Sequence, residues 1–309
     1  MDAGRILVIG AGVNGSVCAS GLQKAGIDVA VLARGTRYDD LRKEGIVIED
    51  AFSGKRSVTK VEIIKALKPD DIYDYILVIV RRNQVSGVLP LLARNKSPNV
   101  VFMGNNLGGS KEYTDALGKD RVMFGFVFAG GRREGDIIKA VTIKSLASPF
   151  GEIDGDITPR VKRLVAIMRQ AGFNAEASPN IMDFLFTHGA GVPLFANLVL
   201  RHGCDTRALA RSPQDLGLLV DSMRESLAVL RATGHRIVPG SLRVIEIVPR
   251  SVLVALFGFA LSLKLAEIGG AYHVSQAPDE MRFLGQELEA LVKKSGLPAP
   301  AIRKVLSTH

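Results

Sequence analysis

The sequence contains no tryptophan and only two cysteines, Cys18 and Cys204, among its 309 residues. Two cysteines are too few for the disulfide framework of a small secreted protein, and they fit a reducing compartment. The first apolar strand begins after four residues, and no cleavage pattern of a secretory leader precedes it. We therefore expect a cytoplasmic protein.

Long apolar runs are also missing. The most apolar stretch, residues 252–263, has 12 residues between Arg250 and Lys264, whereas a membrane-spanning helix needs about 20. We expect no membrane association and interpret this stretch as a helix of a helical domain. It could pack as internal core or form the face of a homodimer.

Several catalytic signatures are absent. The five histidines are widely spaced, and neither an HxxxH nor a CxxC pattern occurs, so we expect no metal site. The chain also lacks the GxSxG element of many hydrolases and the P-loop of nucleoside triphosphatases.

Positive charge is in excess but not concentrated. The 40 lysines and arginines exceed the 31 acidic residues and give a formal net charge of +9. They occur as scattered pairs. Nucleic-acid binders typically have one basic patch interleaved with aromatic residues, and this chain has none in its sequence pattern. We expect no nucleic-acid partner, and a modest positive field that attracts anionic cofactors and acids.

Strand signals dominate the first half of the chain. Five near-continuous apolar runs suit the strands of a parallel sheet covered on both faces, namely RILVIG, DVAVLAR, YILVIV, NVVFMG and MFGFVFA. Residues 136–148 and the run FGEIDG predict additional antiparallel strands. A helix is expected over 158–171, with Thr158 as its N-cap and Pro159 at its first position.

The pattern changes near Ser178, where strand signals nearly disappear. Helical spacing of apolar residues then predicts helices at 180–200, 213–233, 249–268 and 278–295. We therefore predict an α/β N-terminal Rossmann-type domain over residues 1–178 and an all-α C-terminal domain over residues 179–309. The second domain is expected to serve substrate binding or dimerisation.

A glycine-rich loop lies between the first strand and the first helix. It consists of Gly10, Ala11, Gly12, Val13, Asn14 and Gly15. In a GxGxxG loop the first glycine permits the tight turn, the second admits a pyrophosphate, and the third allows helix and strand to pack closely. The N-terminus of the following helix offers free N–H groups to the phosphates. The loop predicts a dinucleotide-binding site.

The end of the second strand indicates which dinucleotide binds. Enzymes that use NAD usually carry an acidic residue there, for the ribose 2′-hydroxyl. In this chain the strand ends in Arg34, whereas Asp28 comes too early and Asp39 too late. An arginine suits a 2′-phosphate, with Arg37 as a second candidate. We predict NADP(H) rather than NAD(H).

With these elements in this order, the chain resembles the ketopantoate reductase (2-dehydropantoate 2-reductase) family. The segments that carry the resemblance are NNLGG, FAGGRREGDII, the run from SPFGEIDG to ASPNI, and DEMRFLGQELEALVKKSGLPAP. It implies a helical domain like the C-terminal domain of 6-phosphogluconate dehydrogenase, and a site in a cleft between the domains. It also implies NADPH-dependent reduction of a 2-keto acid, ketopantoate or a related branched acid.

The resemblance also assigns roles to single residues. The asparagine of the family's HNG-type loop matches Asn105, and the glutamate near the start of its last helix matches Glu280. The lysine at the end of one family strand matches Arg81, with Gln84 retained. Arginine keeps the charge of lysine but not its geometry.

The family's catalytic lysine is the main departure. In the stretch LFTHGAGV its position is taken by His188, and a nearby family asparagine becomes Val192; the serine-rich stretch before the glutamate is altered at residues 268–270. Hydride addition to a ketone creates an alkoxide, which needs a positive charge or a proton donor. His188 could supply the proton, and His273 is the other candidate.

Three activities therefore remain open. The first is an NADPH-dependent 2-keto-acid reductase whose proton donor is a histidine. The second is a catalytically silent protein that binds NADP(H) and acts as a sensor or binds a partner, and the third is an opine-type or hydroxyacid dehydrogenase.

Overall fold

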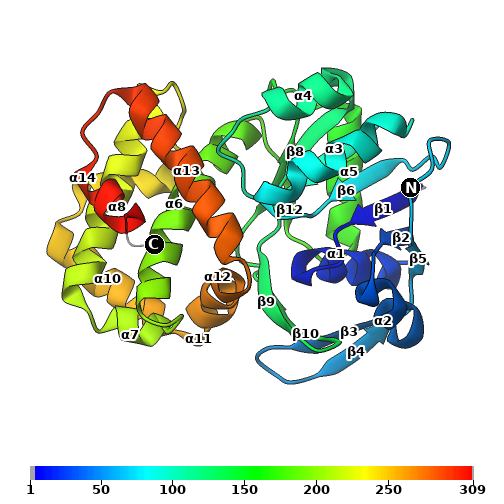
Figure 1. Ribbon diagram of the computed structural model, residues 1–309, viewed down its shortest axis with the longest axis horizontal. Coiled ribbons are helices and arrows are strands. Elements are labelled where there is room, and N and C mark those ends of the chain that lie inside the picture. Colours follow the sequence, from blue (N-terminus) through cyan, green and yellow to red (C-terminus); the bar gives the residue numbers. More distant parts are fainter. Residues whose placement is uncertain (1–3, 308–309) are drawn as a thin grey trace. The chain divides into compact units, whose positions relative to one another are not determined.

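The protein is described by a computed structural model that covers residues 4–307 (Figure 1). These residues form two compact units. The first comprises residues 4–104 and 110–181, and the second comprises residues 105–109 and 182–307. The predicted boundary after residue 178 lies three residues before the last residue of the first unit.

The first unit contains an eight-stranded sheet with the order β12-β11-β8-β7-β6-β1-β2-β5. Its strands are β1 (Arg5–Ile9), β2 (Asp28–Leu32), β5 (Glu62–Ile64), β6 (Tyr75–Val78), β7 (Val100–Met103), β8 (Val122–Gly125), β11 (Ser148–Gly151) and β12 (Ala175–Ala177). In the part of the sheet with the order β8-β7-β6-β1-β2-β5, all neighbouring strands are parallel. Strand β11 runs antiparallel to β8. The predicted α/β fold class is confirmed, and each of the five apolar runs overlaps a strand.

A second sheet of four strands has the order β4-β3-β10-β9. It consists of β3 (Ile46–Asp50), β4 (Arg56–Thr59), β9 (Ala129–Glu134) and β10 (Ile137–Thr142). The antiparallel pairing of β9 with β10 agrees with the strand expected over 136–148. Helix α1 (Val13–Lys24) packs against strands of both sheets, which explains why it buries residues around most of its circumference.

The remaining helices of the first unit connect the strands. They are α2 (Thr36–Glu44), α3 (Val85–Arg94), α4 (Lys111–Leu117) and α5 (Pro159–Gln170). Helix α5 begins as the sequence predicts, because the side chain of Thr158 accepts a hydrogen bond from the backbone N–H of Val161 and Pro159 follows at the first position.

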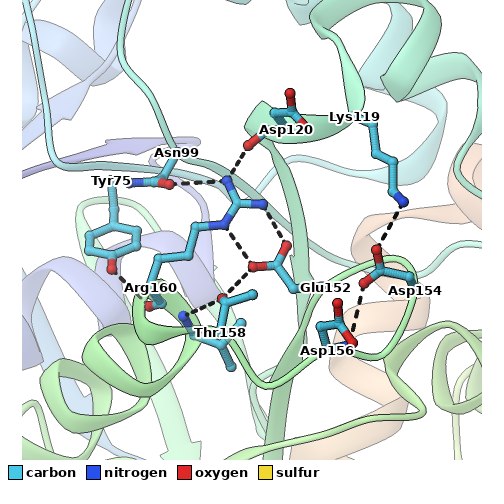
Figure 2. A network of polar contacts seen from close by, with 10 residues as sticks. Tyr75, Asn99, Lys119, Asp120, Glu152, Asp154, Asp156, Thr158 and Arg160 are labelled. Atoms are coloured by element: carbon cyan, nitrogen blue, oxygen red, sulfur yellow. Dashed lines mark hydrogen bonds and ion pairs between the residues drawn. The ribbon is translucent and has the colours of Figure 1, made fainter.

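A polar network closes the amino-terminal edge of the large sheet. Figure 2 shows the guanidinium of Arg160 facing the buried carboxylate of Glu152, with nitrogen–oxygen distances of 2.7 and 2.5 Å. The same guanidinium donates to the side chain of Asn99 at 3.2 Å and to the carbonyl oxygen of Asp120. The hydroxyl of Thr158 donates to Glu152 as well, at 2.6 Å. Both partners of this ion pair are therefore held by hydrogen bonds from several elements.

The second unit is helical. Its helices are α6 (Ile181–Arg201), α7 (Thr206–Ala210), α8 (Pro213–Ala232), α9 (Val244–Ile247), α10 (Arg250–Ser262), α11 (Lys264–Ala266), α12 (Tyr272–Gln276), α13 (Pro278–Ser295) and α14 (Pro300–Leu306). A π-helical turn, Glu267–Ala271, joins α11 to α12. Helix α6 is long and apolar enough to cross a membrane, but 67% of that window is buried, so it is a core helix.

One predicted helix is wrong in its length. The helix expected over 249–268 ends at Ser262, and the chain then bends by 76° into the next helical segment. Leu263 adopts an extended conformation, with ψ of 144°, which interrupts the helical hydrogen bonds. Apolar spacing alone could not reveal this break because residues on both sides of Leu263 keep a helical pattern.

Candidate active site

The glycine-rich loop has the geometry of a phosphate cradle. Gly10 has a φ of +114°, and a Cβ there would lie 2.1 Å from the carbonyl oxygen of Ile79. A Cβ at Gly15 would lie 1.7 Å from the carbonyl oxygen of Gly10, so α1 can approach β1 only if this residue is glycine. A Cβ at Gly12 would meet no atom within 4 Å. The first and third glycines are required by the fold, whereas the second leaves space.

That space adjoins the N-terminus of α1, which begins at Val13. Gly12 is its N-cap and supplies no side-chain cap, so the first turn can offer N–H groups to an anion. The residues present therefore fit the pyrophosphate of a dinucleotide. The predicted cofactor loop lies between β1 and the first turn of α1. It consists of Gly10, Ala11, Gly12, Val13, Asn14 and Gly15.

Two arginines follow β2, and they occupy different environments. Arg34 is exposed, two residues after the carboxyl end of the strand. Arg37 is buried, and its guanidinium donates to the carbonyl oxygen of Ala11 at 3.2 Å and to the hydroxyl of Ser16 at 3.4 Å. Burial, and then the neighbouring charge of Arg133, lower the pKa of Arg37. Arg37 thus supports the glycine-rich loop, whereas the side chain of Arg34 reaches solvent.

Arg81 also lies at the carboxyl edge of the sheet, three residues after β6 ends. Its backbone N–H donates to the side-chain oxygen of Gln84 at 3.3 Å, which fixes the start of a short 3₁₀ helix. Because β6 lies next to β1 in the sheet, this turn and the glycine-rich loop share one edge. Ligands of parallel sheets bind at that edge.

The segment 105–109 follows β7 and packs with the helical unit. Leu107 is buried in the helical core against Gly189 of α6, where an added Cβ would come within 3.1 Å of its side chain. Two glutamates of α13 hold the segment. The amide of Asn105 donates to Glu280 at 3.4 Å, and the backbone N–H of Leu107 donates to Glu287 at 3.2 Å.

Glu280 connects Asn105 to a histidine. The Nε2 atom of His273 lies 3.1 Å from a carboxylate oxygen of Glu280, which is 2% exposed. The side-chain oxygen of Asn105 is buried and has no hydrogen-bond partner within the described residues. A buried oxygen without a partner is costly, so the site favours a ligand that donates a hydrogen bond there.

His188 lies close enough to His273 for their charges to interact, and its ring packs against an aromatic side chain. Its ring stacks on Phe184 with a centroid distance of 5.8 Å. Burial, together with the nearby charge of His273, lowers the pKa of His188 to about 4. His188 is therefore neutral near pH 7 and carries no positive charge there. That it occupies the position of the family's lysine stays a prediction.

The site contains residues that sequence reasoning missed. The sequence did not indicate that Leu107 and Glu287 hold the 105–109 segment. Glu287 stands seven residues after Glu280 and therefore lies on the same face of α13. That spacing was the available signal. Two other histidines belong elsewhere in the unit: His202 pairs with Asp215 at 2.9 Å, and the ring of His235 stacks on Phe186.

The chain thus has a glycine-rich loop at the carboxyl ends of parallel strands in one unit and a cluster of polar side chains in the other. Residues 6–147 match the family model of ketopantoate reductase PanE/ApbA. The chain is 28% identical over 181 residues to a 2-dehydropantoate 2-reductase of Archaeoglobus fulgidus. That match covers 59% of this chain and 58% of the relative.

Solved structures share the fold over nearly the whole chain. A 2-dehydropantoate 2-reductase from Geobacter metallireducens superposes with a TM-score of 0.80 at 18% identity, covering 98% of both chains. The enzyme of that name from Methylococcus capsulatus gives 0.75 at 23% identity, covering 98% of this chain and 94% of the other. D-mandelate dehydrogenase with NADH and anilino(oxo)acetate gives 0.80 at 15% identity, covering 98% and 96%.

Proposed function

We propose that the protein reduces a branched 2-keto acid, ketopantoate or a relative of it, to the 2-hydroxy acid with NADPH. The convergence of Asn105, His273 and Glu280 carries this proposal. These residues supply a hydrogen-bonding amide, a proton donor and a carboxylate in one cluster. In the chain, Asn105 follows β7 after the single residue Gly104.

The preference for NADPH rests on the end of β2. Arg34 stands where an acidic residue would bind the 2′-hydroxyl of NADH, and an exposed guanidinium is free to meet a 2′-phosphate. A solved structure of this fold, that of D-mandelate dehydrogenase, contains NADH. The choice between the two cofactors therefore depends on local residues such as Arg34 rather than on the fold.

The bound nicotinamide would supply the hydride to the ketone carbon. The residues of this chain supply the rest. His273 donates a proton to the developing alkoxide, and Glu280, 3.1 Å from its Nε2 atom, orients its ring. The amide of Asn105 helps to orient the substrate. His188, which is neutral near pH 7, contributes shape and a hydrogen-bonding ring nitrogen instead of charge.

Replacement of His273 tests this assignment. We expect His273→Gln to lower kcat for NADPH oxidation with ketopantoate or another branched 2-keto acid by a factor of about 10² or more. The affinity for NADPH should stay within a few-fold, because His273 lies outside the glycine-rich loop. His202→Gln is the matched control, since it removes a histidine paired with a carboxylate at 2.9 Å outside the cluster.

Each outcome has a distinct meaning. Normal turnover in His273→Gln would reject His273 as the proton donor. Tight NADPH binding without oxidation by any 2-keto acid, in the unmodified protein, would reject the reductase and favour the catalytically silent, NADP(H)-binding alternative. In the cytoplasm, where we place this reaction, both cysteines would remain the free thiols that the structure contains.

A further inference from the structure

Two cations follow neighbouring strands at the edge of the large sheet where the glycine-rich loop lies. Arg34 comes two residues after β2, and Lys65 comes directly after β5. These strands are parallel neighbours, with Leu32 paired to Ile64, and the backbone N–H of Ala33 donates to the carbonyl oxygen of Ile64 at 3.1 Å. Neighbouring strands lie about 4.8 Å apart. Both cations are therefore at the carboxyl edge of the sheet, at the ends of adjacent strands.

The ring of Tyr38 holds the ammonium group of Lys65 in place. Lys65 is exposed, but its Nζ atom lies 4.4 Å from the centroid of that ring. Tyr38 belongs to α2, is 9% exposed and packs in the core of the first unit. The guanidinium of Arg42 lies 5.6 Å from the same centroid and donates to the hydroxyl at 3.2 Å. Both distances are typical of cation–π contacts, so a buried ring fixes the position of the charge on Lys65.

The opposite ends of these strands show a different balance of charge. Arg5, at the start of β1, pairs with Glu62 of β5 at 2.8 Å and with Asp28 of β2 at 3.7 Å. At the carboxyl ends, by contrast, neither Arg34 nor Lys65 makes an ion pair with a carboxylate among residues 4–307. Like charges repel, and an anion bound between two cations turns that repulsion into attraction. The carboxyl ends of β2 and β5 therefore suit an anion.

The chemistry of a dinucleotide identifies that anion. The N-terminus of the first helix takes the pyrophosphate, whereas the ribose 2′-position lies at the end of the second strand. A phosphate monoester carries a charge of about −1.5 to −2 at pH 7. The guanidinium of Arg34 balances only part of this charge. Because β5 lies on the side of β2 that faces away from β1, Lys65 can balance the rest from the side opposite the glycine-rich loop.

We propose that Lys65 is a second specificity-determining residue of the cofactor site, and that its ammonium group, positioned by Tyr38, binds the 2′-phosphate of NADPH together with Arg34. The inference rests on the preference for NADPH proposed above and adds a residue on another strand to it. Lys65 contacts only the phosphate that NADH lacks. It therefore separates the two cofactors without affecting the binding of their shared parts.

The dissociation constants of the two reduced cofactors test this inference. We expect Lys65→Met to raise the dissociation constant of NADPH by about 10-fold or more, because a charge-assisted hydrogen bond to the 2′-phosphate is lost. The dissociation constant of NADH should change by less than about two-fold, since NADH offers no phosphate there. The fluorescence of the reduced nicotinamide measures both. The effect on NADPH should shrink at high salt, where exposed charges are screened.

Replacements of Tyr38 test its positioning role. Tyr38→Leu removes the ring beneath Lys65 and should raise the dissociation constant of NADPH, but not of NADH, by about three-fold. Tyr38→Phe keeps the ring and should bind NADPH as the unmodified protein does. If Tyr38→Leu does not fold, Lys65→Met decides the inference, because an exposed lysine is not part of the core.

Lys96→Met is the matched control. Lys96 is an exposed lysine that precedes β7 at the amino-terminal edge of the sheet, and its loss changes the net charge by the same amount. It should leave both dissociation constants unchanged.

The possible outcomes separate this inference from the proposed function. An equal effect of Lys65→Met on both cofactors, or no effect on NADPH, would overturn the inference alone. An unmodified protein that binds NADH as tightly as NADPH would overturn it together with the proposed cofactor preference. Binding is measured without a keto acid. A protein without turnover that still shows the selective loss of NADPH affinity would therefore support the inference while rejecting the reductase.

Discussion

The two units each contain a buried carboxylate beside a basic side chain, and the two networks differ in whether every buried polar atom has a hydrogen-bond partner. In the α/β unit, Glu152 accepts hydrogen bonds from both Arg160 and Thr158, and the guanidinium of Arg160 also reaches Asn99. In the helical unit, Glu280 binds His273 and Asn105, and the amide oxygen of Asn105 has no partner among residues 4–307. One network is satisfied within the protein, and the other leaves an acceptor available to a ligand.

This difference separates a structural role from a functional one. A buried charge whose hydrogen bonds are all made stabilises one conformation and offers nothing to a substrate. A buried polar atom without a partner costs stability in the absence of ligand, and such a cost is typical of binding sites. Changes in the first network should therefore affect unfolding, and changes in the second should affect turnover.

Removal of Arg160 should have the largest effect. Arg160→Leu leaves the carboxylate of Glu152, 5% exposed, without its cation, and we expect a loss of about 3–5 kcal/mol in the free energy of unfolding. Urea unfolding measures this loss. Lys119→Ala removes an exposed ion pair with Asp154 from the same network and should change stability little. Equal losses in the two variants would contradict the distinction.

Replacement of Asn105 should lower turnover more than it lowers stability. We expect Asn105→Ala to lower kcat/KM for the 2-keto acid by about 100-fold, because the substrate loses an oriented hydrogen-bonding partner. The free energy of unfolding should fall less than in Arg160→Leu, since the variant removes an acceptor that is unsatisfied without ligand together with one long hydrogen bond, at 3.4 Å, to Glu280. If the variant unfolds more readily but has normal turnover, Asn105 has a structural role and not a functional one.

His188 should give the smallest effect, which depends on pH. Its pKa of about 4 in the folded protein lies below the ordinary value of about 6.5, so between these values the unfolded chain binds more protons. The free energy of unfolding should therefore fall as pH drops from 6.5 to 4, by about 2–3 kcal/mol from this residue.

His188→Gln isolates that contribution. Other groups titrate in both proteins, among them His235, whose pKa is also lowered by burial. The pH-dependent part of the difference between the two unfolding curves is thus the share of His188, and the difference should become constant above about pH 7. A constant difference across the range would mean that His188 titrates normally in the folded protein.

Short-range signals in the sequence predicted the α/β unit well. The loop from Gly10 to Gly15 depends on contacts between residues close in sequence or on adjacent strands, and local rules capture it. The N-cap at Thr158 was predicted for the same reason, and its hydrogen bond to Val161 is present. The strands β3 and β4 were not predicted, because they are short and half-exposed.

The helical unit shows why the remaining features could not be predicted. Its candidate site joins Asn105, His273 and Glu280, which are up to 175 residues apart. No periodicity in one segment reports the packing of another. The resemblance to a family pointed to Asn105 and Glu280, but only the structure indicated that the surroundings of His188 lower its pKa to about 4. The role of Glu287 could not be predicted without the structure, because it depends on how the 105–109 segment folds.

The assignment of residues 105–109 to the helical unit has a consequence for the order of folding during synthesis. Leu107 leaves the ribosome about 80 residues before Gly189, the glycine against which it packs. Until α6 has been made, this leucine has no core to enter, although the strands on either side of it can already pair. The nascent sheet must therefore carry an open apolar loop, and the last helices of the chain complete a segment made much earlier.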